Sequence, residues 1–147
     1  VGTVALAALG LEHGTAFGGM GSSRHMMIAA LVEPTVLVSI YALSNFPPHG
    51  TFSASKAAAY SLAQCLRAEM RPAGIRVINV FPGPIDEEWN QQLPPPKLAP
   101  ETLANAVVKA LRDGVEDVYP GDVAQEWLAR WRDDPKVLER ELAMNGG

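Results

Sequence analysis

The sequence predicts an α/β fold built on a parallel β-sheet, and three segments carry this prediction. Residues 35–40 and 75–81 are short runs of β-branched and apolar residues with the composition of buried strands. Between them, residues 53–70 repeat apolar side chains at the spacing of a helix. Short connections join the three segments, so they form a right-handed crossover whose two strands are parallel.

Local signals bound the elements of this crossover. Pro34 precedes the first strand, and the segment Pro-Gly-Pro at 82–84 ends the second strand. Pro72 and Gly74 end the helix of residues 53–70. The side chains expected on the apolar face of this helix are Ala57, Leu62, Ala63, Leu66 and Met70.

The following segment continues the alternation of strand and helix. Residues 86–99 are polar and proline-rich, and such a length is typical of a functional lid. Pro100 begins a helix that ends before Gly114, because proline suits the first helical turn and glycine the position after the last one. A short last strand is expected at Val118 and Tyr119.

Two further helices are expected at the carboxyl end. Asp122 and Gln125, three residues apart, resemble a capping box at the start of the first helix. Trp127 and Trp131 lie on one side of that helix, which is more often a core face than a ligand or partner surface. The second helix is expected over residues 135–144.

Composition limits the partners of the chain. Its 147 residues are 48% hydrophobic and 19% charged, as expected for one small globular domain or part of a larger one. A net charge of −4 offers no basic surface, so nucleic acid is not an expected partner. Residues 1–11 are apolar but too short to span a bilayer, so no membrane is expected. The single cysteine, Cys65, provides neither a disulfide nor a metal site, which favours a reducing, cytoplasmic compartment.

Four signatures occur in the order found in the short-chain dehydrogenase/reductase family, and the resemblance covers residues 36–122. Residues 36–39 resemble the family strand that ends in a catalytic serine, and Ser39 lies thirteen residues before Phe52. Residues 52–56, Phe-Ser-Ala-Ser-Lys, resemble the family motif Tyr-x-x-x-Lys. Residues 75–83 resemble the next strand and its proline-glycine turn.

The resemblance implies a partial Rossmann-like doubly wound parallel sheet, made of the later strands and helices of that fold. It also implies an oxidoreductase that uses NAD or NADP on an alcohol or a carbonyl compound. Ser39 would hold the substrate oxygen, and Lys56 would supply a positive charge and hold the nicotinamide ribose. Pro82, Gly83 and Ile85 would contact the cofactor. For Ser39 and Lys56 the alternatives are a backbone-bonded hydroxyl and a solvated lysine, but their spacing favours the site.

Phe52 stands where the family motif has its catalytic tyrosine. Hydride transfer to a carbonyl carbon requires a proton on its oxygen, and phenylalanine keeps the ring but has no proton to give. The expected loss is about a hundredfold or more in rate. Tyr41 and His49 could both approach the site, although ordinary loop residues are the preferred interpretation. Tyr60, two helical turns beyond Phe52, is expected to pack in the core.

Two parts of the sequence depart from the family pattern. Glu87 stands where the family often has a cofactor-binding threonine, and Asp86 precedes it. These carboxylates would repel a pyrophosphate unless they point away; they either fix a polar substrate or are solvated, and we prefer the solvated interpretation. The family's glycine-rich cofactor loop is missing, since the glycines at 14, 18, 19 and 21 have the wrong spacing.

The domain prediction follows from these departures. Residues 1–34 are interpreted as an irregular remnant resembling the helix before the serine strand, and residues 35–147 as the C-terminal half of a Rossmann domain. Because the chain begins with Val1 rather than methionine, we expect an upstream part, although processing or an unusual start codon would look the same. A truncated reductase of weak or no activity is the first hypothesis.

The second hypothesis is a non-catalytic binding or assembly protein, a pseudoenzyme with the same fold. In the family, the long helix after the tyrosine often packs against a partner subunit. Here Ala57, Ala58, Leu62 and Leu66 could form such a homo-oligomer interface, or they could pack on the sheet. The sequence assigns neither a substrate nor a preference between NAD and NADP, because the residues that distinguish the two cofactors belong to the missing half.

Overall fold

The structure is a computed structural model of the chain, and residues 35–145 are described. The predicted remnant at 1–34, with its glycine cluster, lies outside these residues. The strands are β1 (Thr35–Leu37), β2 (Ile78–Val80) and β3 (Asp117–Val118). The α-helices are α3 (Gly50–Met70), α4 (Pro100–Asp113), α5 (Gly121–Asp133) and α6 (Pro135–Asn145), and the short 3-10 helices are η1 (Ile40–Ala42), η2 (Pro47–His49), η3 (Arg71–Ala73) and η4 (Glu88–Asn90).

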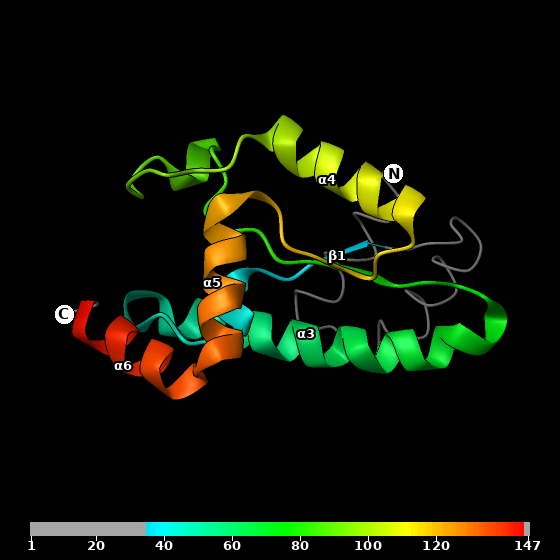
Figure 1. The fold of residues 1–147 in the computed structure, drawn as a ribbon, viewed down its shortest axis with the longest axis horizontal. Helices are drawn as coiled ribbons and strands as arrows, with labels where there is room; N and C mark the ends of the chain where they lie inside the picture. The colour runs from blue at the N-terminus through cyan, green and yellow to red at the C-terminus, as the bar shows by residue number, and fades with distance from the viewer. Residues whose placement is uncertain (1–34, 146–147) are drawn as a thin grey trace.

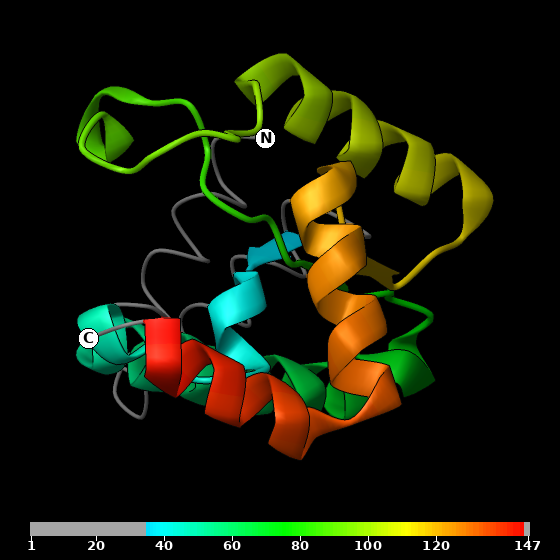
Figure 2. The same cartoon turned by 60° about the vertical axis from the view of Figure 1, so that its left-hand side comes forward.

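The three described strands form one parallel sheet in the order β1-β2-β3, which confirms the predicted α/β fold. Both views show α3 on one side of the sheet and α4 on the other (Figures 1 and 2). Helices therefore cover both faces, as in a doubly wound sheet. The prediction of a partial Rossmann-like architecture is confirmed in the described residues.

Strand β2 and the residues on either side of it, 77–81, separate two hydrophobic cores, because successive side chains point to opposite faces of the sheet. Val77 and Phe81 lie in the core on the α3 side, whereas Ile78 and Val80 lie in the core on the α4 side. The α3 core also contains Val36, Val38, Ile40, Ala63, Leu66, Met70 and Ala124. Tyr60 packs against Phe81 with ring centroids 5.0 Å apart, as predicted.

The strands are shorter than predicted, for local reasons. β1 ends at Leu37 because the backbone turns at Ser39 into η1. The N–H groups of Val38 and Ile40 still donate to Val80 O and Pro82 O, at 2.7 and 3.1 Å, so this segment stays beside β2. At residue 75 the N–H group donates back to Met70 O, so the strand expected from 75 begins at Ile78. β3 lies one residue earlier than expected.

The helices agree with the predictions except in three details. α3 begins at Gly50, three residues before the predicted start, so Phe52 lies in its first turn. Ala57 is exposed, so its predicted place on the apolar face of α3 was wrong. The capping box was also wrong: Pro120 is the N-cap residue of α5, and Gln125 Nε2 instead donates to Tyr119 O at 2.6 Å.

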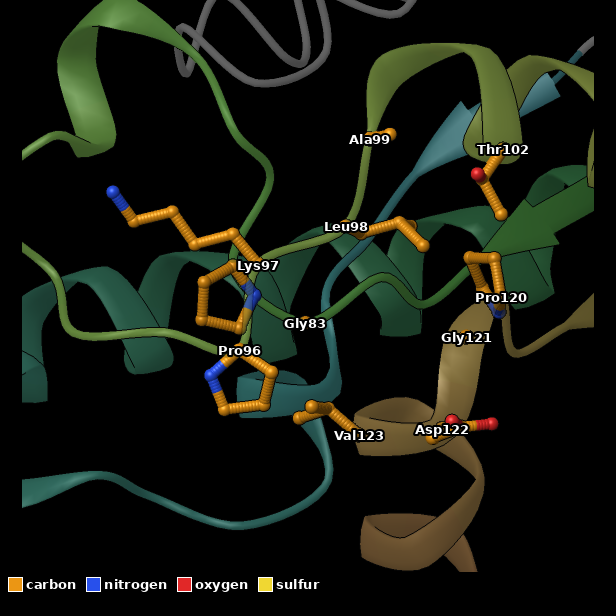
Figure 3. A pocket seen from close by; sticks show the side chains of 11 residues that line it. Gly83, Pro96, Lys97, Leu98, Ala99, Thr102, Pro120, Gly121, Asp122 and Val123 are labelled. Atoms are coloured by element: carbon orange, nitrogen blue, oxygen red, sulfur yellow. The ribbon is translucent and has the colours of Figure 1, made fainter.

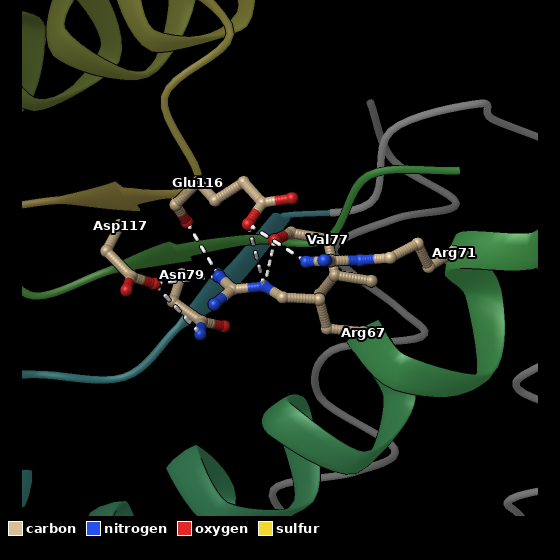
Figure 4. A network of polar contacts seen from close by, with 6 residues as sticks. All are labelled: Arg67, Arg71, Val77, Asn79, Glu116 and Asp117. Atoms are coloured by element: carbon tan, nitrogen blue, oxygen red, sulfur yellow. Dashed lines mark hydrogen bonds and ion pairs between the residues drawn. The ribbon is translucent and has the colours of Figure 1, made fainter. Parts of the chain in front are cut away.

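Arg67 of α3 ties the helix to the sheet (Figure 4). Its guanidinium donates to Val77 O at 3.1 Å and to Glu116 O at 2.8 Å, and it forms an ion pair with Asp117 Oδ1 at 2.7 Å. Asn79 Nδ2 shares that carboxylate oxygen at 3.3 Å. One side chain thereby fixes the positions of β2 and β3 relative to α3. No helix among residues 35–145 is long and apolar enough to cross a membrane.

Candidate functional site

A cleft of about 460 Å³ opens where β1 and β2 end. Parallel sheets bind ligands at this edge, because the loops that follow the strands diverge there. All six residues that the sequence predicted for the site line this one cleft: Ser39, Phe52, Lys56, Pro82, Gly83 and Ile85. Their individual roles remain predictions.

Ser39 enters the cleft from a strained backbone. Its φ of 104° and ψ of 146° belong to a region that residues with a side chain rarely adopt, and such a conformation costs about 1–3 kcal/mol. The side chain is buried, and Oγ accepts a hydrogen bond from Tyr41 N at 3.3 Å. The backbone therefore donates to the Ser39 hydroxyl oxygen, as expected from the alternative of a backbone-bonded hydroxyl. The hydroxyl proton stays available for donation.

Phe52 and Lys56 lie one helical turn apart on the same face of α3. The ring of Phe52 is 45% exposed although phenylalanine is strongly apolar. Lys56 Nζ lies 5.5 Å from the centroid of that ring and donates to Leu37 O at 3.3 Å. The ammonium group is thus held between the end of β1 and the face of the ring.

Tyr41 and His49 both line the cleft, as the sequence allowed. The Tyr41 ring meets Phe52 edge-on at 6.3 Å, stacks on Phe46 at 5.4 Å and meets Trp127 edge-on at 5.5 Å. Burial raises the pKa of the Tyr41 phenol. A higher pKa makes this phenol a weaker proton donor than an ordinary tyrosine.

Gly83 brings helix α5 close to the floor of the cleft. A Cβ atom at this position would lie 3.1 Å from Val123 Cγ1 and 3.5 Å from Ile40 Cδ1. Gly83 and Pro84 also border a second cavity of about 490 Å³, with Val123 and Leu98 among its other lining residues. Figure 3 shows Gly83 between the lid residues on one side and the first turn of α5 on the other. The missing side chain therefore permits the close approach of α5.

The lid of residues 86–99 is anchored at both of its ends. Ile85 and Leu98 form an isolated parallel bridge, in which Leu98 N donates to Pro84 O at 2.7 Å. Within the lid, Asn90 Nδ2 donates to Ile85 O at 3.0 Å. These bonds bring four residues to the cleft that sequence reasoning did not identify: Trp89, Asn90, Gln92 and Leu93. Proline content identified the lid, but no local signal identified which of its side chains face the cleft.

The two carboxylates at the start of the lid have different surroundings. Asp86 Oδ1 accepts from Gln91 Nε2 at 3.3 Å and lies 4.0 Å from Lys97 Nζ. Glu87 instead lines the cleft. Both residues are exposed, as the preferred solvated interpretation expected. Within residues 35–145, no three His, Cys, Asp or Glu side chains are grouped in a way that could hold a metal ion.

Comparison with known proteins points to one family. The sequence profile of the short chain dehydrogenases matches residues 35–97. The chain is similar to a short chain dehydrogenase from Burkholderia cenocepacia, crystallised in complex with NADP, with a TM-score of 0.78 and 36% identity over 87% of this chain and 56% of that one. It is 32% identical over 85 residues to an uncharacterized oxidoreductase of Staphylococcus saprophyticus, a region that covers 52% of this chain and 35% of that protein.

A bulky-bulky ketone specific alcohol dehydrogenase from Comamonas testosteroni shares the fold, with a TM-score of 0.53 and 19% identity over 80% of this chain and 50% of that one. The chain thus spans about a third of the curated relative and about half of these two structures. The predicted Ser39 and Lys56 motifs lie within the matched residues 35–97. The profile match and these similar proteins support the assignment of the chain to the short-chain dehydrogenase/reductase family.

Proposed function

We propose that this chain contributes the substrate side of an oxidoreductase that uses NAD or NADP to interconvert an alcohol and a carbonyl compound. One observation supports this proposal most strongly: Ser39, Phe52 and Lys56 come from two separate segments and line the same cleft. A hydroxyl, a ring and an ammonium group at the carboxyl edge of a parallel sheet suit carbonyl reduction. The similarity to short chain dehydrogenases supports the same class of reaction.

The residues around the cleft fit one end of the cofactor. Lys56 Nζ, next to Leu37 O, could hold the nicotinamide ribose, while Pro82, Gly83 and Ile85 offer a floor for the ring. When bound, the cofactor would supply the hydride. The phosphate end fits less well, because the Glu87 carboxylate lines the cleft and would repel phosphate. No glycine-rich phosphate loop occurs in the sequence of residues 35–145.

Each side chain has a distinct role in the proposed reaction. The Ser39 hydroxyl donates to the substrate oxygen and orients it. The charge of Lys56 stabilises negative charge as it develops on that oxygen. Phe52 gives no proton, so the proton must come from water or from Tyr41 or His49. We therefore expect the reaction to be slow, by about a hundredfold or more relative to a relative with tyrosine at this position.

The matched pair Ser39→Ala and Ser44→Ala tests this proposal. Ser44 lies in the same connection and is partly buried, but it is not among the lining residues of the cleft. The assay is NADH- or NADPH-linked reduction of a panel of ketones and aldehydes by the chain, including any coding sequence upstream of Val1. We expect Ser39→Ala to lower the rate at least tenfold and Ser44→Ala to leave it unchanged. Equal rates in both variants would contradict the assigned site.

The alternative proposal is a non-catalytic assembly protein. The outer face of α3 supports it, because Ala54, Ala57, Ala58 and Ser61 are exposed and small enough for a second copy of the helix to approach. Leu66 is buried in the core, which favours the other alternative for this residue, packing on the sheet. Light scattering of the wild-type chain and of Ala58→Arg tests this proposal. A dimer that the arginine dissociates supports it, and a monomer in both cases contradicts it.

In either proposal the exposed thiol of Cys65 favours a reducing cytoplasm.

A further inference from the structure

Aromatic rings from three different segments line the cleft. Phe52 comes from the first turn of α3, Tyr41 from η1 and Trp89 from η4 in the lid. Phe52 is 45% exposed and Trp89 is 88% exposed. Exposed apolar surface is costly in water. Two large rings exposed on the same cleft therefore favour a ligand that covers them.

The ring of Phe52 is held in a fixed orientation. The edge of the Tyr41 ring contacts it at 6.3 Å with an interplanar angle of 74°. The ammonium group of Lys56 lies 5.5 Å from its centroid. Tyr41 is itself stacked on Phe46 at 5.4 Å and cannot turn away easily. The exposed part of the Phe52 ring is thus a preorganised surface against which a planar group can stack.

The charges around the cleft do not favour an anionic ligand. None of the described residues that line it is an arginine, the side chain best suited to bind a carboxylate or a phosphate. Lys56 donates to Leu37 O and lies over Phe52, and Glu87 adds a negative charge to the rim. The lining is otherwise mostly uncharged. An uncharged ligand fits this arrangement better than an acid.

We propose that the cleft binds an uncharged ketone or alcohol that carries an aromatic ring, with the ring against Phe52 and Trp89 and the oxygen at Ser39. This inference rests on the proposed function for the oxygen, and it assigns the substrate class. The cleft volume of about 460 Å³ lies in the lower part of the range for small-molecule sites. The expected aromatic part of the ligand is a single ring or two fused rings. Phe52 then has a function of its own, because its ring binds the substrate although it gives no proton.

Three ligands of matched size test the substrate class without any cofactor. They are 2-acetylnaphthalene, its saturated analogue 2-acetyldecalin, and the anion 6-acetyl-2-naphthoate, each titrated into the chain and followed by ligand-observed NMR. We expect the aromatic ketone to bind about three- to tenfold more tightly than the other two, as one or two aromatic contacts would give. Equal affinity for the saturated ketone, tighter binding of the anion, or no binding of any ligand would overturn the inference.

Variants of the rings locate the binding surface. Phe52→Leu and Trp89→Leu should each weaken binding of 2-acetylnaphthalene about three- to tenfold and change that of 2-acetyldecalin less than twofold. Val137→Ala is the control, because Val137 is 46% exposed but lies on α6 away from the cleft residues. Phe52→Tyr retains the ring and should retain binding whether or not the chain turns over a substrate. Loss of activity and loss of ring recognition are therefore distinguishable. An equal effect of Phe52→Leu, Trp89→Leu and Val137→Ala on the binding of 2-acetylnaphthalene would overturn the inference.

Discussion

The ammonium group of Lys56 lies 5.5 Å from the ring centroid of Phe52, and both side chains project from the first two turns of α3. In the family motif, a lysine in this place lowers the pKa of a tyrosine. Here the charge faces a ring without a hydroxyl, so no acid is activated. The spacing of the motif is kept, and we propose that its proton chemistry is lost.

Arg67 should contribute more to stability than its neighbour Arg71. Arg67 is 14% exposed and bonds to Val77 O, Glu116 O and Asp117, whereas Arg71 is 69% exposed and reaches only Glu116, at 3.5 Å, among the described residues. We expect Arg67→Met to lower the free energy of unfolding by about 2–3 kcal/mol, because it removes the contacts of a mostly buried guanidinium, among them its bond to the carbonyl oxygen of buried Val77. Arg71→Met should change it by less than about 1 kcal/mol. Urea unfolding of both variants measures the difference.

Gly83 should be intolerant of a side chain for a steric reason. Its Cβ atom would lie 3.1 Å from Val123 Cγ1, so alanine must push α5 outward. We expect Gly83→Ala to destabilise the chain by about 1–3 kcal/mol. The control is Gly50→Ala, whose Cβ would have 3.8 Å of clearance from Asn45. Thermal unfolding should also show that Val123→Ala restores part of the loss; no restoration would mean that the crowding lies elsewhere.

Stability should fall at high pH because of Tyr119. Burial, and then the negative charge of Asp117, raise the pKa of this phenol from 10.0 to about 12. Between these values the unfolded chain has released the proton and the folded chain still holds it, so the stabilisation is complete below pH 10 and is lost as the pH rises to about 12. The slope of the free energy of unfolding cannot exceed about 1.4 kcal/mol per pH unit, because one proton is released, and the partial exposure of the side chain reduces the effect further.

Tyr119→Phe isolates this effect. The ring stacks on Phe81 with centroids 4.7 Å apart, and phenylalanine can keep that contact. Urea unfolding at a series of pH values should therefore give a flatter profile above pH 10 for the variant than for the wild type. Parallel profiles would show that another group causes the loss of stability.

Some parts of the fold follow directly from local sequence. Pro100 and Gly114 bound α4 because proline fits only the first turn of a helix and glycine adopts the left-handed conformation after the last turn. The lengths of the strands do not follow from local sequence, since they depend on hydrogen bonds to residues distant in the chain. The turn at Ser39 ends β1 inside an apolar run that has no local stop signal.

In the candidate site, too, some residues could be predicted from local sequence and others depend on long-range contacts. The spacing of Ser39, Phe52 and Lys56 predicted residues that line one cleft, because a strand end and a helix start have fixed relative positions in a parallel sheet. Trp89 was missed because its position depends on the bridge between Ile85 and Leu98, which joins the two ends of the lid. Such a long-range contact has no signature in the residues around the tryptophan.

The most direct test of the central claim is the rate of Phe52→Tyr, measured as cofactor-linked reduction of an aromatic ketone. The new hydroxyl would lie beside Lys56, whose charge lowers the pKa of a phenol and makes it a competent acid. We expect a gain of about a hundredfold over the wild type. Phe52→Leu serves as the control and should not exceed the wild-type rate. An unchanged rate in Phe52→Tyr, with ketone binding intact, would contradict the claim that this position holds the missing proton donor.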